Sequence, residues 1–98
     1  MRRALVIAVL AACGPSIPRP TLVDAQRAGT TVEILDAGRA LYVSRCGKCH
    51  SLYAPSEYAP ATWPDKVAAM RDKAKLVPED EAQIVRYLQT LASRSTPP

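Results

Sequence analysis

Five consecutive residues near the middle of the chain have the types and spacing of a covalent haem site. They read Cys46-Gly47-Lys48-Cys49-His50. Three residues apart, the thiols of Cys46 and Cys49 lie on the same side of a helical turn, so each can add to one vinyl group of a haem. The imidazole of His50 follows directly and is placed to bind the iron as its proximal ligand. The run predicts one covalent haem with two thioether bonds.

Three other chemistries use the same residue types. A structural zinc site needs four ligands, and because His50 is the only His, Cys13 would have to be the fourth. A redox pair of the thioredoxin type needs a βαβ context, which this sequence lacks. A plain disulfide would leave His50 without a role. Covalent haem accounts for all the residues of the run.

The first twelve residues have the pattern of a secretory signal. Two Arg precede nine uninterrupted apolar residues from Ala4 to Ala12, too few to span a membrane. Leu10-Ala11-Ala12-Cys13 resembles the lipobox of bacterial lipoproteins, in which the signal is cut before the Cys and the Cys is acylated. An ordinary signal peptide is the alternative, although a lone Cys is then a liability in an oxidising compartment. We expect residues 1–12 to be removed and acylated Cys13 to anchor the protein to a membrane.

The signal predicts a location in the periplasm or cell envelope. Gly14 rather than Asp follows the Cys, as in lipoproteins sorted outward, and inner and outer membrane both stay open.

Loss of Arg2 and Arg3 takes two of the 13 basic residues, so 11 remain against 9 acidic, a net charge of +2. Two haem propionates bring this near zero, and no nucleic-acid partner is indicated. One segment is cationic and contains Lys66, Arg71, Lys73 and Lys75. Such a segment is typical of a solvated helix face, and the alternative is a docking patch for an acidic redox partner.

The remaining chain divides into a tether, a helical domain and a tail. Residues 13–30 hold three Pro and no sustained periodicity, which predicts a flexible, lipid-anchored tether. Residues 31–93 carry helical patterns and no segment that favours a sheet. Residues 94–98 are expected to be disordered. A domain of this size has a small hydrophobic core, and the whole chain contains no Phe and one Trp, so the stability of the domain alone would be marginal. A haem would add the apolar surface that the core lacks.

Three helices are expected in the domain. The first lies within 33–45 and starts either with a capping box of Thr30 and Glu33 or at Asp36. A Gly inside it, at position 38, suggests a close helix crossing. The second follows an N-cap at Thr62, with Asp65 at the capping-box position. The third runs from Pro78 to about residue 93, with a poor cap at position 77 that an acidic first turn offsets.

The second helix carries an apolar stripe that includes a Met. Trp63, Val67, Met70 and Ala74 recur at i, i+4, i+7 and i+11, and most such stripes are core. Met70 is nevertheless the only Met left after signal removal, and no second His exists. We therefore expect it to be the distal iron ligand. The alternatives are a gap-filling core role for Met70, Lys73 or Lys75 as the ligand, and an open iron position.

Residues 36 to 92 resemble a small class I c-type cytochrome. Gly38 and Tyr42 lie eight and four residues before Cys46, as in that family's Gly-x-x-x-aromatic approach to Cys-x-x-Cys-His. The run at 84–88 is similar to the family's C-terminal helix, whose aromatic residue, here Tyr87, crosses the first helix at the Gly. The resemblance implies an all-α fold of about three helices around one covalent haem, with Cys46 and Cys49 as thioether positions and His50 as proximal ligand.

Other parts of the resemblance concern the surroundings of the haem. In the family a Pro carbonyl commonly orients the proximal His, and Pro55 and Pro60 are the two candidates here. Tyr58 and Trp63 are expected to pack against the haem. Met70 departs from the longer members because it lies only twenty residues after the proximal position. Shortened bacterial cytochromes have a similar Trp-x-x-x-Val-x-x-Met run.

The expected function is one-electron transfer by a monomeric, membrane-tethered monohaem cytochrome that meets a protein donor and a protein acceptor. Six-coordinate iron changes little when an electron moves, and sulfur ligation favours the reduced form. No residue has the pattern of a catalytic group, so we do not expect an enzyme. A haem-based gas sensor and an accessory haem subunit of a respiratory complex are the alternatives.

Overall fold

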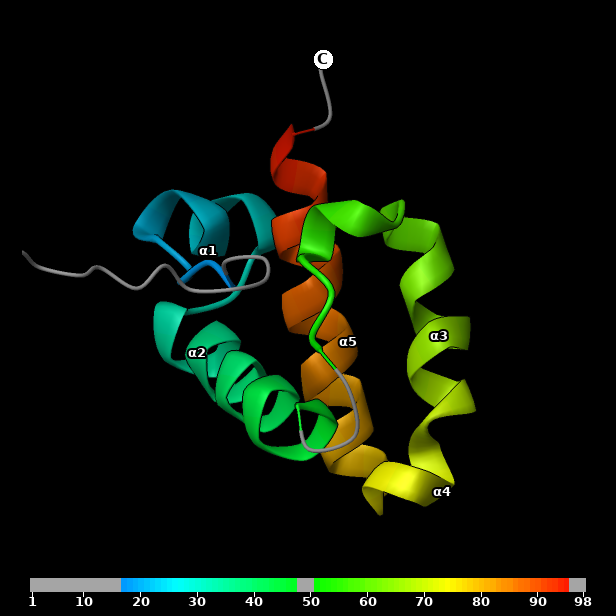
Figure 1. Cartoon of the computed structure of the whole chain (residues 1–98). Helices are drawn as coiled ribbons and strands as arrows, with labels where there is room; N and C mark the ends of the chain where they lie inside the picture. Colours follow the sequence, from blue (N-terminus) through cyan, green and yellow to red (C-terminus); the bar gives the residue numbers. More distant parts are fainter. Residues whose placement is uncertain (1–16, 48–50, 96–98) are drawn as a thin grey trace, which may run out of the picture.

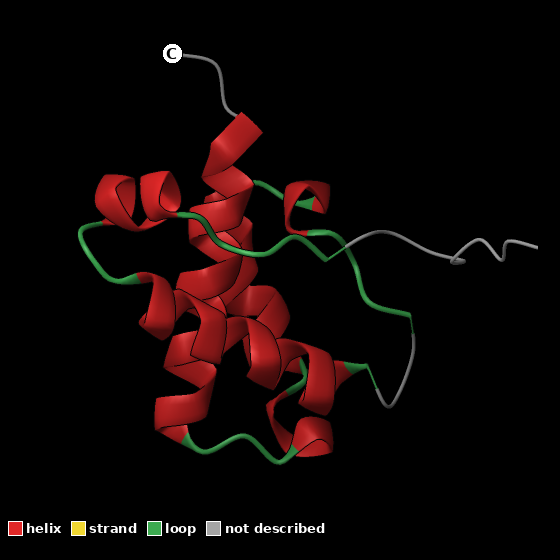
Figure 2. Cartoon of the chain, turned by 90° about the vertical axis from the view of Figure 1, so that its left-hand side faces the viewer, coloured by secondary structure: helices red, strands yellow, loops and turns green. Residues whose placement is uncertain are grey.

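The computed structural model describes residues 17–47 and 51–95, and this part of the chain is all-helical (Figures 1 and 2). The predicted all-α class is confirmed. No helix among the described residues is both long and apolar enough to traverse a bilayer. The helices are α1 (Leu22–Ala28), α2 (Val32–Leu41), α3 (Trp63–Ala69), α4 (Arg71–Ala74) and α5 (Pro78–Ala92), with a π-helical turn at Tyr42–Cys46 and 3-10 turns at Pro55–Glu57, Pro60–Thr62 and Ser93–Ser95.

Helix α5 stands in the centre, with α2 on one side and α3 on the other (Figure 1). Its inward side chains Ile84, Tyr87 and Leu88 are fully buried. Helix α2 crosses it at Gly38, where an added Cβ would lie 2.3 Å from the main-chain oxygen of Gln83 and 2.9 Å from Cβ of Tyr87. The predicted close crossing of the two helices is therefore confirmed.

The expected tether is wrong for residues 17–30, which fold onto the domain. Thr21 and Asp24 form a capping box that starts α1, and Gly29 ends it in the left-handed conformation at φ 69°. The preceding segment is also held, because Arg39 Nη2 donates to the carbonyl of Ile17 at 3.0 Å. The helix was not predicted because it is short and the segment contains three Pro, so the sequence shows no sustained hydrophobic periodicity. Residues 13–16 lie outside the described part.

The C-terminal end of α5 is bound to α1 through a buried carboxylate. Arg94 Nη2 lies 2.6 Å from Oδ2 of Asp24, whose side chain is 2% exposed. The same guanidinium donates to the carbonyl of Arg19 at 3.1 Å, and Arg27 approaches the other Asp24 oxygen at 3.3 Å. The disordered tail predicted from residue 94 is therefore wrong at Arg94, while residues 96–98 lie outside the described part.

We expect the buried carboxylate of Asp24 to make the folded state acid-sensitive. Its hydrogen bond from Arg94 lowers the pKa of Asp24 from 3.8 to about 2. Because the folded pKa is the lower one, the stabilisation is present above about pH 4 and is lost as the pH falls toward 2. The shift corresponds to about 2 kcal/mol of unfolding free energy. Urea unfolding at several pH values measures this effect. Between pH 4 and pH 2 the unfolding free energy of Asp24→Asn should fall by about 2 kcal/mol less than that of wild type, whereas an equal fall in both proteins would exclude this contribution.

The helix starts differ from the expectations in two places. Helix α2 begins one residue later than the capping box of Thr30 with Glu33 implied, because the hydroxyl of Thr31, not Thr30, accepts from the Ile34 amide at 3.1 Å. Thr62 makes no side-chain cap bond, because it has helical backbone angles at the end of a 3-10 turn that runs into α3. The capping box of Thr62 with Asp65 is therefore wrong. Helix α5 begins at Pro78 after an uncapped Val77, as predicted.

Candidate functional site

An apolar cavity of about 230 Å³ lies between the π-helical turn that follows α2 and helix α3. Four residues singled out in the sequence line it: Cys46, Tyr58, Trp63 and Met70. These residues come from three separate stretches of the chain, and the fold brings them to one place. The other lining residues are Tyr42, Tyr53, Lys66, Val67 and Ala69.

The π-helical turn places Cys46 in the wall of the cavity. Helix α2 changes to this wider turn over Tyr42–Cys46, so Tyr42 and Cys46 both face inward and are buried. Such single π-turns inside helices are frequent at functional sites because they change which side chains face the interior. Residues 48–50 lie outside the described part, so the predicted roles of Cys49 and His50 stay predictions.

Aromatic rings form most of the remaining wall. Trp63 meets Tyr58 edge to face, with ring centroids 5.2 Å apart, and Tyr58 meets Tyr53 at 5.7 Å. Two of the lining rings donate to the main chain: Trp63 Nε1 to the Pro55 carbonyl at 2.9 Å, and the Tyr42 hydroxyl to the Tyr53 carbonyl at 2.6 Å. Burial raises the pKa of Tyr42, so this phenol stays neutral. The rings therefore offer apolar surface to whatever occupies the cavity.

Met70 lies where the predicted second helix is broken. Helix α3 ends at Ala69, Met70 has φ −100° and ψ 2°, and α4 begins at Arg71. Trp63 and Val67 belong to the described hydrophobic core, as the stripe predicted, whereas Met70 is half-buried and is not among the residues of that core. Met70 lines the cavity, as do Trp63 and Val67. This placement favours a site role for Met70 over a gap-filling one.

Lys66 is the one charged residue in the described lining of the cavity. Its ammonium lies 4.5 Å from the centroid of the Tyr58 ring, a cation–π distance. With no Asp or Glu in that lining, the wall is a poor site for a hard cation. A thiol, a thioether and aromatic rings instead suit a covalently held haem. The cavity is smaller than ligand pockets of about 300–1,000 Å³, so a porphyrin would be only partly enclosed.

Both candidate Pro carbonyls already accept a hydrogen bond from another side chain. Pro55 receives the Trp63 indole, and Pro60 receives Nε2 of Gln89 at 3.0 Å. A carbonyl oxygen has two lone pairs, so either one retains capacity for an imidazole N–H. Because His50 lies outside the described residues, the choice between the two carbonyls stays open.

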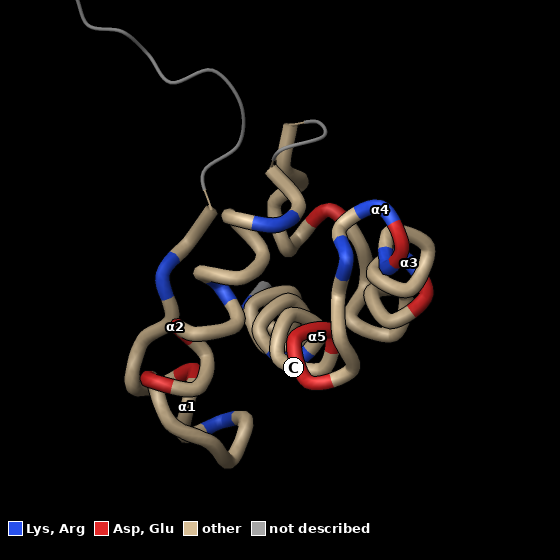
Figure 3. The backbone as a smooth tube through the Cα atoms, turned by 90° about the horizontal axis from the view of Figure 1, so that it is seen from below, with Lys and Arg blue, Asp and Glu red and all other residues tan. Residues whose placement is uncertain are grey.

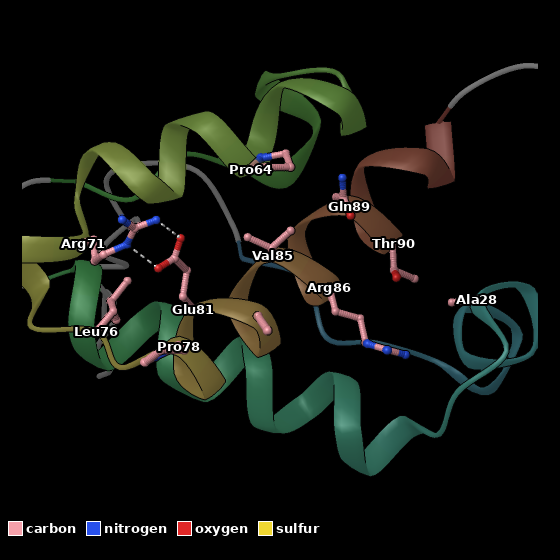
Figure 4. Close-up of a pocket in the computed structure, with 11 residues that line it drawn as sticks. Ala28, Pro64, Arg71, Leu76, Pro78, Glu81, Val85, Arg86, Gln89 and Thr90 are labelled. Atoms are coloured by element: carbon pink, nitrogen blue, oxygen red, sulfur yellow. Dashed lines mark hydrogen bonds and ion pairs between the residues drawn. The ribbon is translucent and has the colours of Figure 1, made fainter.

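A second cavity, of about 860 Å³, lies along α5 on the side of Pro64, Leu76 and Ala28 (Figure 4). No Cys, His or Met is among its described lining residues. A bidentate ion pair of Arg71 with Glu81, at 2.6 Å, occupies one end of it. Despite its size, this groove has no donor set for the chemistry that the sequence predicts.

The cationic segment does not form a uniform patch. Figure 3 shows basic and acidic residues together on α3 and α4. Arg71 is paired with Glu81, and Lys66 lies over a ring, while Lys73 and Lys75 are exposed. This mixture agrees with a solvated helix face, and docking of an acidic partner there stays a prediction.

Among the described residues, no three His, Cys, Asp or Glu side chains gather in a way that would hold a metal ion. Cys49 and His50 are not among those residues. Comparison with family models, with curated proteins and with solved structures finds no match for this chain. A functional assignment therefore depends on the motif and on the cavity beside it.

Proposed function

We propose that this protein is a monohaem electron carrier with a small c-type cytochrome fold. Cys46 and Cys49 hold the haem by thioether bonds, His50 is the proximal iron ligand, and Met70 is the distal one. The observation that carries the proposal is that Cys46 and Met70 line one cavity walled by aromatic rings. The residues between them in the chain include the rest of the haem-attachment motif.

The chain's own residues have simple tasks in this proposal. The haem, when bound, supplies a one-electron redox centre. Tyr58 and Trp63 pack against it and keep water away, and Lys66 places a positive charge at the wall. A peroxidase would need a distal acid–base group, and the described lining contains no His, Asp or Glu. An electron carrier needs no such group, so the proposal assigns no catalytic residue.

The proposed setting is the bacterial cell envelope. Acylated Cys13 anchors the protein to a membrane, and a donor and an acceptor protein exchange electrons with it as a monomer. The haem-based sensor would require an iron position open to diatomic ligands, and Met70 in the cavity wall argues against it.

A haemochrome assay tests the proposal. We expect the protein made in a host that attaches haem to contain one haem per chain, resistant to acid–acetone extraction and with the pyridine spectrum of two thioether bonds. Cys46→Ser should shift that spectrum to the one-thioether position, and Cys46→Ser with Cys49→Ser should release the haem on extraction. Cys13→Ser is the matched control and should keep the haem while losing the lipid. Colourless wild-type protein from such a host would sink the proposal.

A further inference from the structure

The proposed anchor lies very close to the folded body. Only three residues separate Cys13 from Ile17, where the described part begins, so their Cα atoms are at most about 14 Å apart. The segment that follows is fixed to the body: Arg39 bonds the carbonyl of Ile17, and Arg94 bonds that of Arg19. The body therefore cannot stand far from a membrane that holds Cys13.

Helix α1 presents two large apolar side chains outward, directly after this segment. Leu22 is 64% exposed and Val23 is 67% exposed, while Asp24 and Ala25 on the other side of the helix are buried. Leu22 is five residues from Ile17, so it lies within about 18 Å of the point where the anchor segment joins the body. Figure 2 shows the segment before α1, α1 and α2 on the face that is turned to the viewer.

Exposed apolar residues are ordinary on protein surfaces, so exposure alone indicates no partner. For Leu22 and Val23 the evidence is their position close to the proposed anchor. Leu22 and Val23 lie mostly exposed in the first turn of a short helix, within one short chain length of the proposed lipid attachment. Arg19, three residues before Leu22, has a side chain that is 74% exposed, and its guanidinium lies 3.9 Å from the Asp36 carboxylate. A phospholipid surface matches this combination of aliphatic and cationic side chains.

We infer that the outer face of α1, formed by Leu22 and Val23, rests in the interface of the phospholipid bilayer that holds Cys13. The inference rests on the proposed acylation of Cys13. It deepens the proposed function, because the carrier is then held on the membrane in one orientation instead of turning freely on a long tether. Its partners must approach it from the sides that α1 leaves free.

A nitroxide on α1 tests this contact. Gln26 is exposed one turn after Leu22, so Gln26→Cys places a label on the same face and keeps both apolar residues. The acylated, haem-loaded protein would be placed in phosphatidylethanolamine–phosphatidylglycerol vesicles. We expect the label to lose most of its collisions with a water-soluble nickel chelate and to keep those with oxygen. Leu22→Ser with Val23→Ser should restore the nickel collisions without changing the acyl mass.

Val77 provides the matched control. It is 51% exposed, and it lies about 20 Å along α5 from Thr90, whose carbonyl accepts from Arg27 of α1 at 2.7 Å. A label on Val77→Cys should stay open to the nickel chelate, and Val77→Ser should leave the label at position 26 protected. Equal nickel collisions at positions 26 and 77 in acylated protein would overturn the inference. If the acyl mass were missing, both the proposed anchor and the membrane contact would be wrong. If the label were protected in a protein that holds no haem, the membrane contact would stand and the proposed electron transfer would be wrong.

Discussion

Gly38→Ala should lower the unfolding free energy of the protein by about 2 kcal/mol or more, although Ala is the better helix former. At an open helix position the same change would raise it by about 1 kcal/mol. Here the new Cβ would lie 2.3 Å from the main-chain oxygen of Gln83, which cannot rotate away as a side chain can. Helices α2 and α5 would have to separate, and such overpacking costs about 1–3 kcal/mol and occasionally more. The sign of the change therefore distinguishes the crossing from helix propensity.

Urea unfolding of the mature protein, followed by circular dichroism, measures this effect. Ala37→Gly is the matched control, because Ala37 is the exposed neighbour on the same helix and its loss should cost only about 1 kcal/mol of propensity. If Gly38→Ala proved neutral or stabilising, the close approach of α2 to α5 would not exist in solution. A small domain has a total stability near the low end of about 5–15 kcal/mol, so the expected loss is a large share of it.

The two crossing helices were predictable because their signals are local and agree with each other. A Gly in an amphipathic pattern, together with an aromatic residue in a second pattern, indicates a close contact. Helix α5 has an acidic first turn and a long apolar face, and its bounds were found almost to the residue. Both helices bury their apolar stripes against each other, so the pattern in the sequence directly reflects the packing.

Helix α1 could not be predicted in the same way. Seven residues give two turns, and its most apolar members, Leu22 and Val23, point outward. Its position is fixed by long-range polar contacts, with Asp24 and Arg94 seventy residues apart. Hydrophobic periodicity contains no information about a polar contact between residues so far apart in the sequence. Thr21 with Asp24 was the one local signal, since this spacing is a capping box.

The candidate site was partly predictable. Cys46, Tyr58, Trp63 and Met70 were named from spacing and resemblance, and all four line the same cavity. Tyr53 was missed as a lining residue, although it lies five residues before Tyr58 in a loop that the motif leads into. The sequence pattern places Lys66 only among the surface cations, because its position over the Tyr58 ring depends on how the loop folds against α3.

The break at Met70 has the most direct consequence for function. Trp63 and Val67 of the same apolar stripe belong to the core and also line the cavity. Met70 follows the end of α3 at Ala69 and lines the same cavity as Cys46, but it is not among the residues of the core.

Met70→Leu should therefore change the haem without changing the fold. Leu nearly matches Met in volume, so stability should change by less than about 1.5 kcal/mol, whereas the proposed thioether ligand would be lost. We expect the weak charge-transfer absorption of ferric Met-ligated haem to disappear, carbon monoxide to bind the reduced protein at once, and the reduction potential to fall by a sizeable part of the about 0.8 V that axial ligands span. Tyr58→Phe is the control, because it keeps a ring in the same wall and should leave all three properties unchanged. If wild type already lacks the charge-transfer band, or if the Leu variant retains it, then Met70 does not bind the iron.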